Sequence, residues 1–126
     1  MNTKRITLLS LFFILPIFAS IGQAAVLRAV TVETEDAAAY AQQIALGAEI
    51  MRISGSPGTI RVWQGVYAGD NAGSVVVTVE YPTLSALAAD REALAQNEAF
   101  SEWLADLAEI RTILSDSVYE EITVTP

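Results

Sequence analysis

The side chains of this chain that are best suited to binding chemistry gather on one predicted strand. Arg61, Trp63 and Tyr67 occupy odd-numbered positions of residues 59–68, so in a strand they point to the same face. A guanidinium beside aromatic rings can hold a planar, anionic or aromatic ligand by stacking and cation–π contact. The same residue types are also enriched at subunit interfaces. The pattern therefore indicates either a pocket lining or an interface.

A carboxylate belongs to the same predicted hairpin. Glu80 lies near the end of the next strand, and a buried carboxylate there could act as a general base. An ion pair with Arg61 is the favoured interpretation, and if exposed it contributes less than about 1 kcal/mol. Arg61, Trp63, Tyr67 and Glu80 are the candidate ligand-binding residues, and no catalytic residue is assigned.

The sequence lacks the residue types that several enzyme mechanisms require. The chain has no His and no Cys, and its lysine is Lys4, near the start. These absences exclude a Ser-His-Asp triad, a cysteine nucleophile and an imidazole metal site, and leave no Schiff-base lysine after the first residues. The Gly-rich segment 55–58 follows a predicted helix rather than a strand, so it is a turn and not a phosphate loop. We therefore expect neither a cofactor nor a metal.

The first residues resemble a secretory signal peptide. Lys4 and Arg5 precede an apolar run, residues 6–21, and small residues follow at Gly22 and Ala24. A basic start, an apolar run and a small-residue cleavage site are typical of such signals. The run is shorter than the roughly 20 residues that a spanning helix needs, which disfavours the alternative of an uncleaved anchor. We expect cleavage after Ala24, export to the periplasm or medium, and one domain over residues 25–126.

The mature chain is strongly acidic. Its five arginines stand against fifteen Asp and Glu residues, a net charge of −10. Such a surface repels phosphate backbones and anionic lipid head groups. We therefore expect no nucleic-acid partner and no membrane partner once the signal is removed.

The pattern of apolar residues predicts the order β-α-β-β-α-α-β. Strands are favoured by β-branched runs, and helices by apolar residues at helical spacing after capping residues. The expected strands are 25–34, 59–68, 74–81 and 118–125, and the expected helices are 36–52, one starting at Thr83 and one from Asn97 to Leu114. This order is that of an α+β, ferredoxin-like domain with a four-stranded antiparallel sheet.

The two middle strands form a predicted hairpin with a short loop at residues 69–72. Matching apolar positions across the hairpin then places Arg61 opposite Glu80, and Trp63 opposite Thr78. These four residues and Tyr67 share the face away from the helices. Helices cover only one face of such a sheet, so the other face needs a different cover.

One long segment resembles a known group of proteins. In the run VVVTVEYPTLSALAADREALAQNEAFSEWL, residues 75–104, a Val-rich strand ends in Glu-Tyr-Pro and is followed by an Ala-rich helix. After a break at Asn97, Phe100 and Trp103 lie in the next helix. The chain resembles the dimeric α/β-barrel superfamily, which includes antibiotic-biosynthesis monooxygenases and the NIPSNAP-like and stress-responsive barrel proteins.

This resemblance implies a homodimer in which two open sheet faces close a barrel. Activities in the superfamily range from cofactor-free oxidation of polycyclic aromatics to haem breakdown, and haem-binding members use a His ligand, which this chain lacks. The resemblance thus implies the fold and the homodimer without selecting an activity.

Two functions follow as hypotheses. The first is an exported protein that binds a small apolar or aromatic ligand at the open sheet face, or that serves as a dimeric structural module. The alternative is a cofactor-independent monooxygenase acting on an electron-rich aromatic substrate.

Overall fold

The computed structural model describes residues 24–126. Nearly all of the predicted signal peptide, residues 1–24, therefore lies outside the described residues, and export remains a prediction. Within the described part, no helix combines the length and the apolar character needed to cross a membrane.

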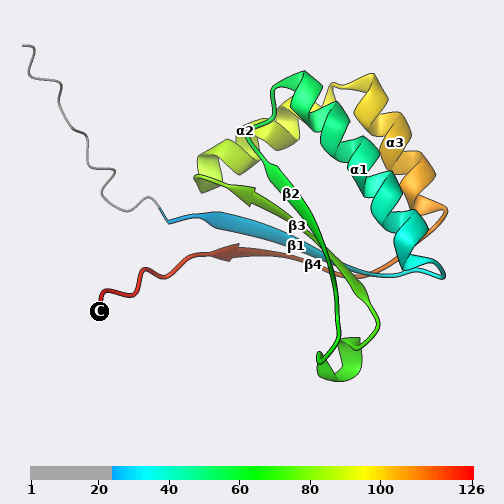
Figure 1. The fold of residues 1–126 in the computed structure, drawn as a ribbon. Coiled ribbons are helices and arrows are strands. Elements are labelled where there is room, and N and C mark those ends of the chain that lie inside the picture. The colour runs from blue at the N-terminus through cyan, green and yellow to red at the C-terminus, as the bar shows by residue number, and fades with distance from the viewer. Residues whose placement is uncertain (1–23) are drawn as a thin grey trace, which may run out of the picture.

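The predicted order of elements is confirmed (Figure 1). The elements are β1 Val26–Glu33, α1 Ala37–Ser54, β2 Thr59–Gln64, the short 3-10 helix η1 Gly69–Asn71, β3 Val75–Tyr81, α2 Leu84–Ala95, α3 Glu98–Ala108 and β4 Thr112–Glu120. The strands form one open antiparallel sheet in the order β2-β3-β1-β4. The predicted α+β, ferredoxin-like fold is thereby confirmed.

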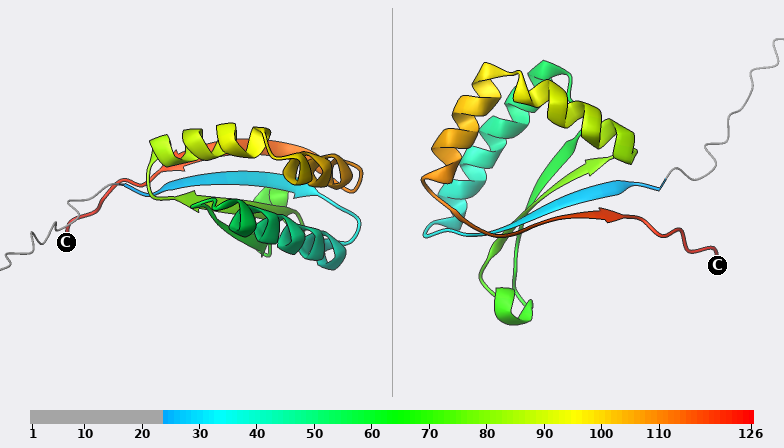
Figure 2. Two further views of the ribbon diagram at one scale, coloured as in Figure 1. Left: turned by 90° about the horizontal axis from the view of Figure 1, so that it is seen from above. Right: turned by 180° about the vertical axis from the view of Figure 1, so that it is seen from behind.

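The helices and the sheet are joined by one main core. In β1, Val30 and Val32 turn toward the helices and pack with Tyr40 and Ile44 of α1 and with Leu107 of α3. The alternation along the strand turns every second side chain toward the helices. Figure 2 shows the twist of the sheet and the hairpin tip, which projects away from the helices.

Each helix begins at a residue that the sequence favours as an N-cap. The side chains of Asp36, Thr83 and Asn97 accept hydrogen bonds from backbone N–H groups in the first turns of α1, α2 and α3. Helix α1 ends at Gly55, whose φ of 80° lies in the left-handed region that favours glycine.

The predicted boundary between α3 and β4 is wrong. The apolar stripe was expected to continue through Ile110 and Leu114, but α3 ends at Ala108 and β4 begins at Thr112. Residues 112–120 pair with β1 along its whole length, with a bulge between Thr31 and Val32. The backbone hydrogen bonds of this pairing outweigh a helical spacing that only the last few residues share.

The predicted hairpin register is also wrong, by two residues. Thr59 lies opposite Glu80, and Arg61 lies opposite Thr78. The loop is longer than expected, because Gly65 already bonds across the hairpin to Ser74 and η1 fills the turn. A shift by two residues leaves every side chain on its predicted face.

Gly47 offers a test of the packing between α1 and α3. A Cβ atom at this position would overlap the ring of Trp103. Glycine-to-alanine changes inside a helix normally stabilise by about 0.5–1 kcal/mol. We expect Gly47→Ala to lower the free energy of unfolding instead, by about 1–3 kcal/mol, because the indole must move. Urea denaturation measures this change.

The double variant Gly47→Ala/Trp103→Phe is the control. It should be less destabilised than the sum of the two single variants, since the smaller ring leaves room for the new methyl group. Strictly additive effects would show that the overlap is relieved elsewhere.

Candidate functional site

Three of the four predicted site residues meet on the open sheet face. Arg61 of β2 and Glu80 of β3 form an ion pair with Nη1 and Oε2 3.1 Å apart. Trp63 donates from Nε1 to Thr78 Oγ1 at 2.7 Å. Both contacts run diagonally across the hairpin, which explains why they form despite the shifted register. Tyr67 lies apart from them, fully exposed in the loop after β2.

The open face is a surface rather than a pocket. Trp63 and Tyr119 are each more than half exposed. None of the four predicted residues lines either hollow found among residues 24–126. The proposed ligand site on this face therefore remains a prediction.

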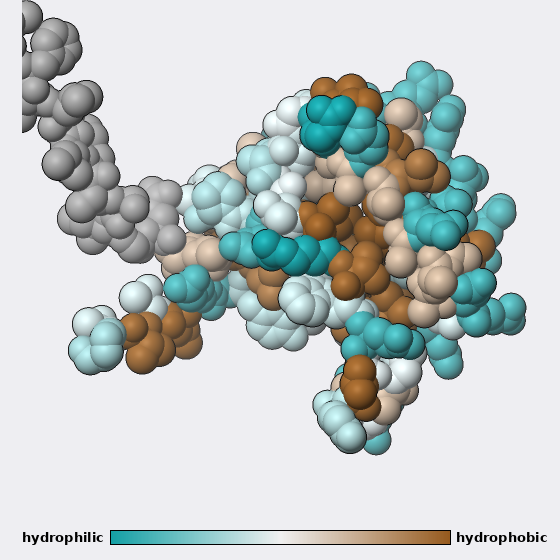
Figure 3. Space-filling view, viewed as in Figure 1, coloured by the Kyte–Doolittle hydropathy of each residue, from teal (hydrophilic) through white to brown (hydrophobic). Residues whose placement is uncertain are grey.

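A cavity lies on the other side of the sheet, beneath the helices. Its volume is about 280 Å³, and every strand and every α-helix of the described chain contributes to its lining. Apolar and aromatic side chains make up most of the wall: Val30, Ile44, Met51, Ile60, Val77, Val79, Tyr81, Leu94, Ala95, Phe100, Trp103, Leu104 and Ile113. Figure 3 shows apolar side chains gathered at the centre of one face, with hydrophilic ones around them.

Two aromatic rings pack against each other in the lining of the cavity. The ring centroids of Phe100 and Trp103 are 5.2 Å apart and their planes are tilted by 42°, which is a favourable geometry for aromatic pairs. Trp103 also donates from Nε1 to the carbonyl oxygen of Gln43 at 2.7 Å. This hydrogen bond satisfies the indole N–H, so the ring presents only carbon atoms to the cavity.

Three arginines line the same cavity. They come from β1 (Arg28), from α2 (Arg91) and from the turn before β4 (Arg111). The lining residues include no carboxylate. After residue 24 the chain has only five arginines, so an acidic protein concentrates most of its positive charge at one apolar hollow.

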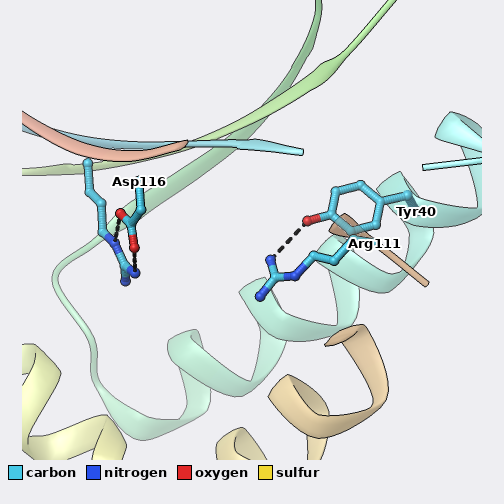
Figure 4. Close-up of polar contacts among 4 residues, drawn as sticks. Tyr40, Arg111 and Asp116 are labelled. Carbon is cyan, nitrogen blue, oxygen red and sulfur yellow. Dashed lines mark hydrogen bonds and ion pairs between the residues drawn. The ribbon is translucent and has the colours of Figure 1, made fainter. Parts of the chain in front are cut away.

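Arg28 is already paired. Its Nε and Nη2 atoms donate to the two oxygens of Asp116 in β4, at 3.0 and 2.6 Å (Figure 4). This bidentate hydrogen bond raises the pKa of Arg28 and lowers the pKa of Asp116. The positive charges of Arg91 and Arg111 lower the pKa of Asp116 further. The three guanidinium groups therefore all act on the Asp116 carboxylate.

Arg111 is only partly satisfied. Its Nη1 donates to the hydroxyl oxygen of Tyr40 at 3.1 Å (Figure 4), and the Tyr40 side chain is fully buried in the core. The Nε atom of Arg111 is buried and has no hydrogen-bond partner. Buried polar atoms without a partner are rare in folded proteins, so this N–H calls for an explanation.

A buried hydroxyl–carboxylate network adjoins the cavity. The Tyr81 hydroxyl donates to Asp90 Oδ2 at 2.6 Å, and Ser56 Oγ donates to the same oxygen at 2.7 Å. Asp90 is 5% exposed. Burial and the hydrogen bond to Asp90 raise the pKa of Tyr81 well above its usual range. Tyr81 therefore stays a neutral donor at physiological pH.

Arg111 also borders a second, more open hollow. This hollow has a volume of about 750 Å³, and four acidic residues help to line it: Glu33, Glu35, Asp36 and Glu109. Within residues 24–126 no group of three or more His, Cys, Asp or Glu side chains is arranged to hold a metal ion.

The cavity was not predicted from the sequence, although two of its arginines stand at unusual positions there. Arg28 interrupts the buried positions of the first strand, between Val26 and Val30. Arg91 falls at helical spacing with Leu87 and Leu94, on the apolar side of the helix that starts at Thr83. A charged residue on a face that is otherwise buried is informative, because such a charge needs a partner or a ligand.

Comparisons with known proteins support the fold. No family model matches the chain, and no curated protein matches it either. A variant of SnoaB, a cofactor-independent oxygenase from Streptomyces nogalater, superimposes with a TM-score of 0.60 at 15% identity, covering 83% of this chain and 99% of that one. A NIPSNAP family protein from Agrobacterium tumefaciens gives 0.59 at 13% identity, over 79% and 93%.

The third structure is a Bordetella bronchiseptica protein described as an antibiotic biosynthesis monooxygenase. It gives a TM-score of 0.56 at 13% identity, over 82% of this chain and all of the other. These are the kinds of protein that residues 75–104 resemble. At such low identity the similarity confirms the fold and leaves activity open.

The network around Tyr81 predicts a loss of stability at alkaline pH. The pKa of Tyr81 in the folded state lies above the value of about 10 in an unfolded chain. Its contribution is therefore complete below about pH 10 and is lost as the pH rises beyond that value. We expect the Tm to fall more steeply above pH 10 in the parent protein than in Tyr81→Phe, as measured by circular dichroism.

Tyr67→Phe is the matched control, because it removes the hydroxyl of a fully exposed tyrosine. This variant should keep the parent's dependence on pH. Equal slopes for the parent and Tyr81→Phe would show that the network does not control alkaline unfolding.

Proposed function

We propose that this protein binds a small, planar, largely apolar molecule in the cavity beneath its helices. The observation that carries the proposal is the cavity itself, with its apolar lining and the fixed ring pair Phe100–Trp103. Ligand sites are usually concave, mostly apolar and equipped with a few well-placed polar groups. A volume of about 280 Å³ lies just below the roughly 300–1,000 Å³ of typical ligand pockets, which favours a ligand of one or two rings.

The helix-covered cavity is a better site than the open face. It is bounded by side chains from all layers of the fold, whereas Trp63 and Tyr119 on the open face are more than half exposed. A ligand bound beneath the helices is covered by side chains of both the sheet and the helices, and the contact with water that it loses there drives the binding of apolar molecules.

Oxygenation is the second candidate, because SnoaB has the same fold and is a cofactor-independent oxygenase. An electron-rich aromatic substrate would supply the electrons, with one oxygen atom entering the product and the other leaving as water. Arginines could stabilise the substrate anion that must form first. The lining residues, however, include no carboxylate, imidazole or thiol to take the proton, so binding is the function we propose.

Nuclear magnetic resonance can test where a ligand binds. The chain has two tryptophans, Trp103 in the cavity wall and Trp63 on the open face, so a ¹⁵N-labelled sample gives two indole N–H signals. Trp63→Phe assigns them. We expect indole, a neutral two-ring probe, to shift the Trp103 signal and leave the Trp63 signal in place.

Leu104→Trp, which enlarges a lining residue, should weaken this effect because the added ring occupies space in the cavity. A shift of the Trp63 signal alone would place the ligand on the open face and contradict the proposal.

For the open sheet face we propose a second copy of this chain as the partner, as the resemblance implies. The face carries two exposed aromatic side chains, Trp63 on one edge strand and Tyr119 on the other, together with the opposite charges of Arg61 and Glu80. A surface that carries both charges beside an apolar area suits pairing about a two-fold axis, where the same patch meets itself. The export of the chain is likewise a proposal that rests on residues 1–24.

Trp63→Ala tests the homodimer. Aromatic side chains at the centre of an interface carry much of its energy, so we expect this change to weaken the dimer about tenfold or more in sedimentation equilibrium. Tyr67→Ala removes a similar ring from the loop beyond β2 and should leave the dimer intact. A parent protein that sediments as a monomer at high micromolar concentration would refute the pairing.

A further inference from the structure

The guanidinium group of Arg111 lines the cavity with its hydrogen-bonding capacity only partly used. A buried guanidinium N–H without a partner costs free energy, because its hydration is lost and not replaced. Arg111 is held in place through Nη1 by the buried Tyr40 hydroxyl. The same guanidinium keeps a second donor, Nη2, which has no hydrogen bond within residues 24–126 and is not buried, so a bound acceptor can pair with it.

The three arginines that line the cavity differ in how far they are paired. Arg28 is satisfied by Asp116 through two hydrogen bonds. Arg91, by contrast, forms no side-chain hydrogen bond or ion pair with residues 24–126, and Arg111 has only Tyr40. Two of the three guanidinium groups thus keep free donors beside a lining that has no carboxylate.

We propose that the ligand of this cavity is an organic acid, a small planar carboxylate. Its carboxylate accepts a hydrogen bond from Arg111 Nη2 and lies in the field of Arg91, and its ring packs against Phe100 and Trp103. This inference rests on the proposed function, since it names the chemical class of the molecule bound at the same site.

The physical chemistry of the groups favours a carboxylate over a neutral ligand. Guanidinium groups match the planar geometry of a carboxylate, and hydrogen bonds between the two charged groups are stronger than those between neutral ones. The apolar wall strengthens them further by excluding water. The acidic surface of the protein repels anions. The affinity for a carboxylate must therefore come from the arginines of the cavity.

Isothermal titration calorimetry with a matched pair of probes tests the inference. The probes are 2-naphthoate and 2-naphthamide, which share a ring system and a shape and differ in charge. At pH 7 the parent protein should bind the carboxylate about 10- to 100-fold more tightly, as expected for a charge-assisted hydrogen bond. Arg111→Gln should reduce this preference to about threefold or less while the amide still binds.

Arg52→Gln is the matched control. Arg52 lies on the exposed side of α1, pairs with Glu49 and does not line the cavity, so this variant makes the same charge change and should keep the preference. If Arg111→Gln does not fold, Arg91→Gln supplies the test, because Arg91 is an exposed residue of α2 and its loss should also lower the preference.

The outcomes separate this inference from the proposed function. Equal affinity for the two probes, with the Trp103 indole signal shifted by both, overturns the organic acid and leaves cavity binding in place. A preference that survives Arg111→Gln and Arg91→Gln also overturns it. Failure of both probes and of indole to bind overturns the proposed function as well.

Discussion

Strand β1 is hydrogen bonded on both sides, and the rest of the structure depends on these two pairings. On one side β3 pairs with it and brings the hairpin into the sheet; on the other, β4 pairs with it from Val26 to Glu33. The alternation along β1 directs Val26, Val30 and Val32 toward the helices. The same alternation directs Arg28 there as well, so a charge enters the covered side of the fold.

The pairing of β4 then determines how that charge is accommodated. Asp116 lies opposite Val30 in the register and so faces the helices too, within reach of Arg28. Beyond the bulge the pairing continues to Thr112, while α3 ends at Ala108, so Arg111 falls in the short connection between them. The cationic lining of the cavity is thus a consequence of strand pairing.

The two faces of the sheet have different chemistry. The open face carries a diagonal ion pair and an indole bonded to a threonine hydroxyl, and its groups satisfy one another. The covered face has a cavity, a buried Asp90 shared by Tyr81 and Ser56, and a guanidinium with an unused donor. These differences underlie our proposals that a ligand binds at the covered face and that a second copy of the chain packs on the open face.

The sequence by itself determined the order of the elements, the helix caps at Asp36, Thr83 and Asn97, and the face on which each hairpin residue lies. These features depend on neighbours a few residues apart, which the alternation of strands and the spacing of helices express directly. The hairpin register, the start of β4 and the convergence of Arg28, Arg91 and Arg111 were decided only by the tertiary structure. They depend on hydrogen bonds and packing between distant segments, such as Arg28 and Asp116, which are 88 residues apart. No local pattern encodes which distant groups will meet.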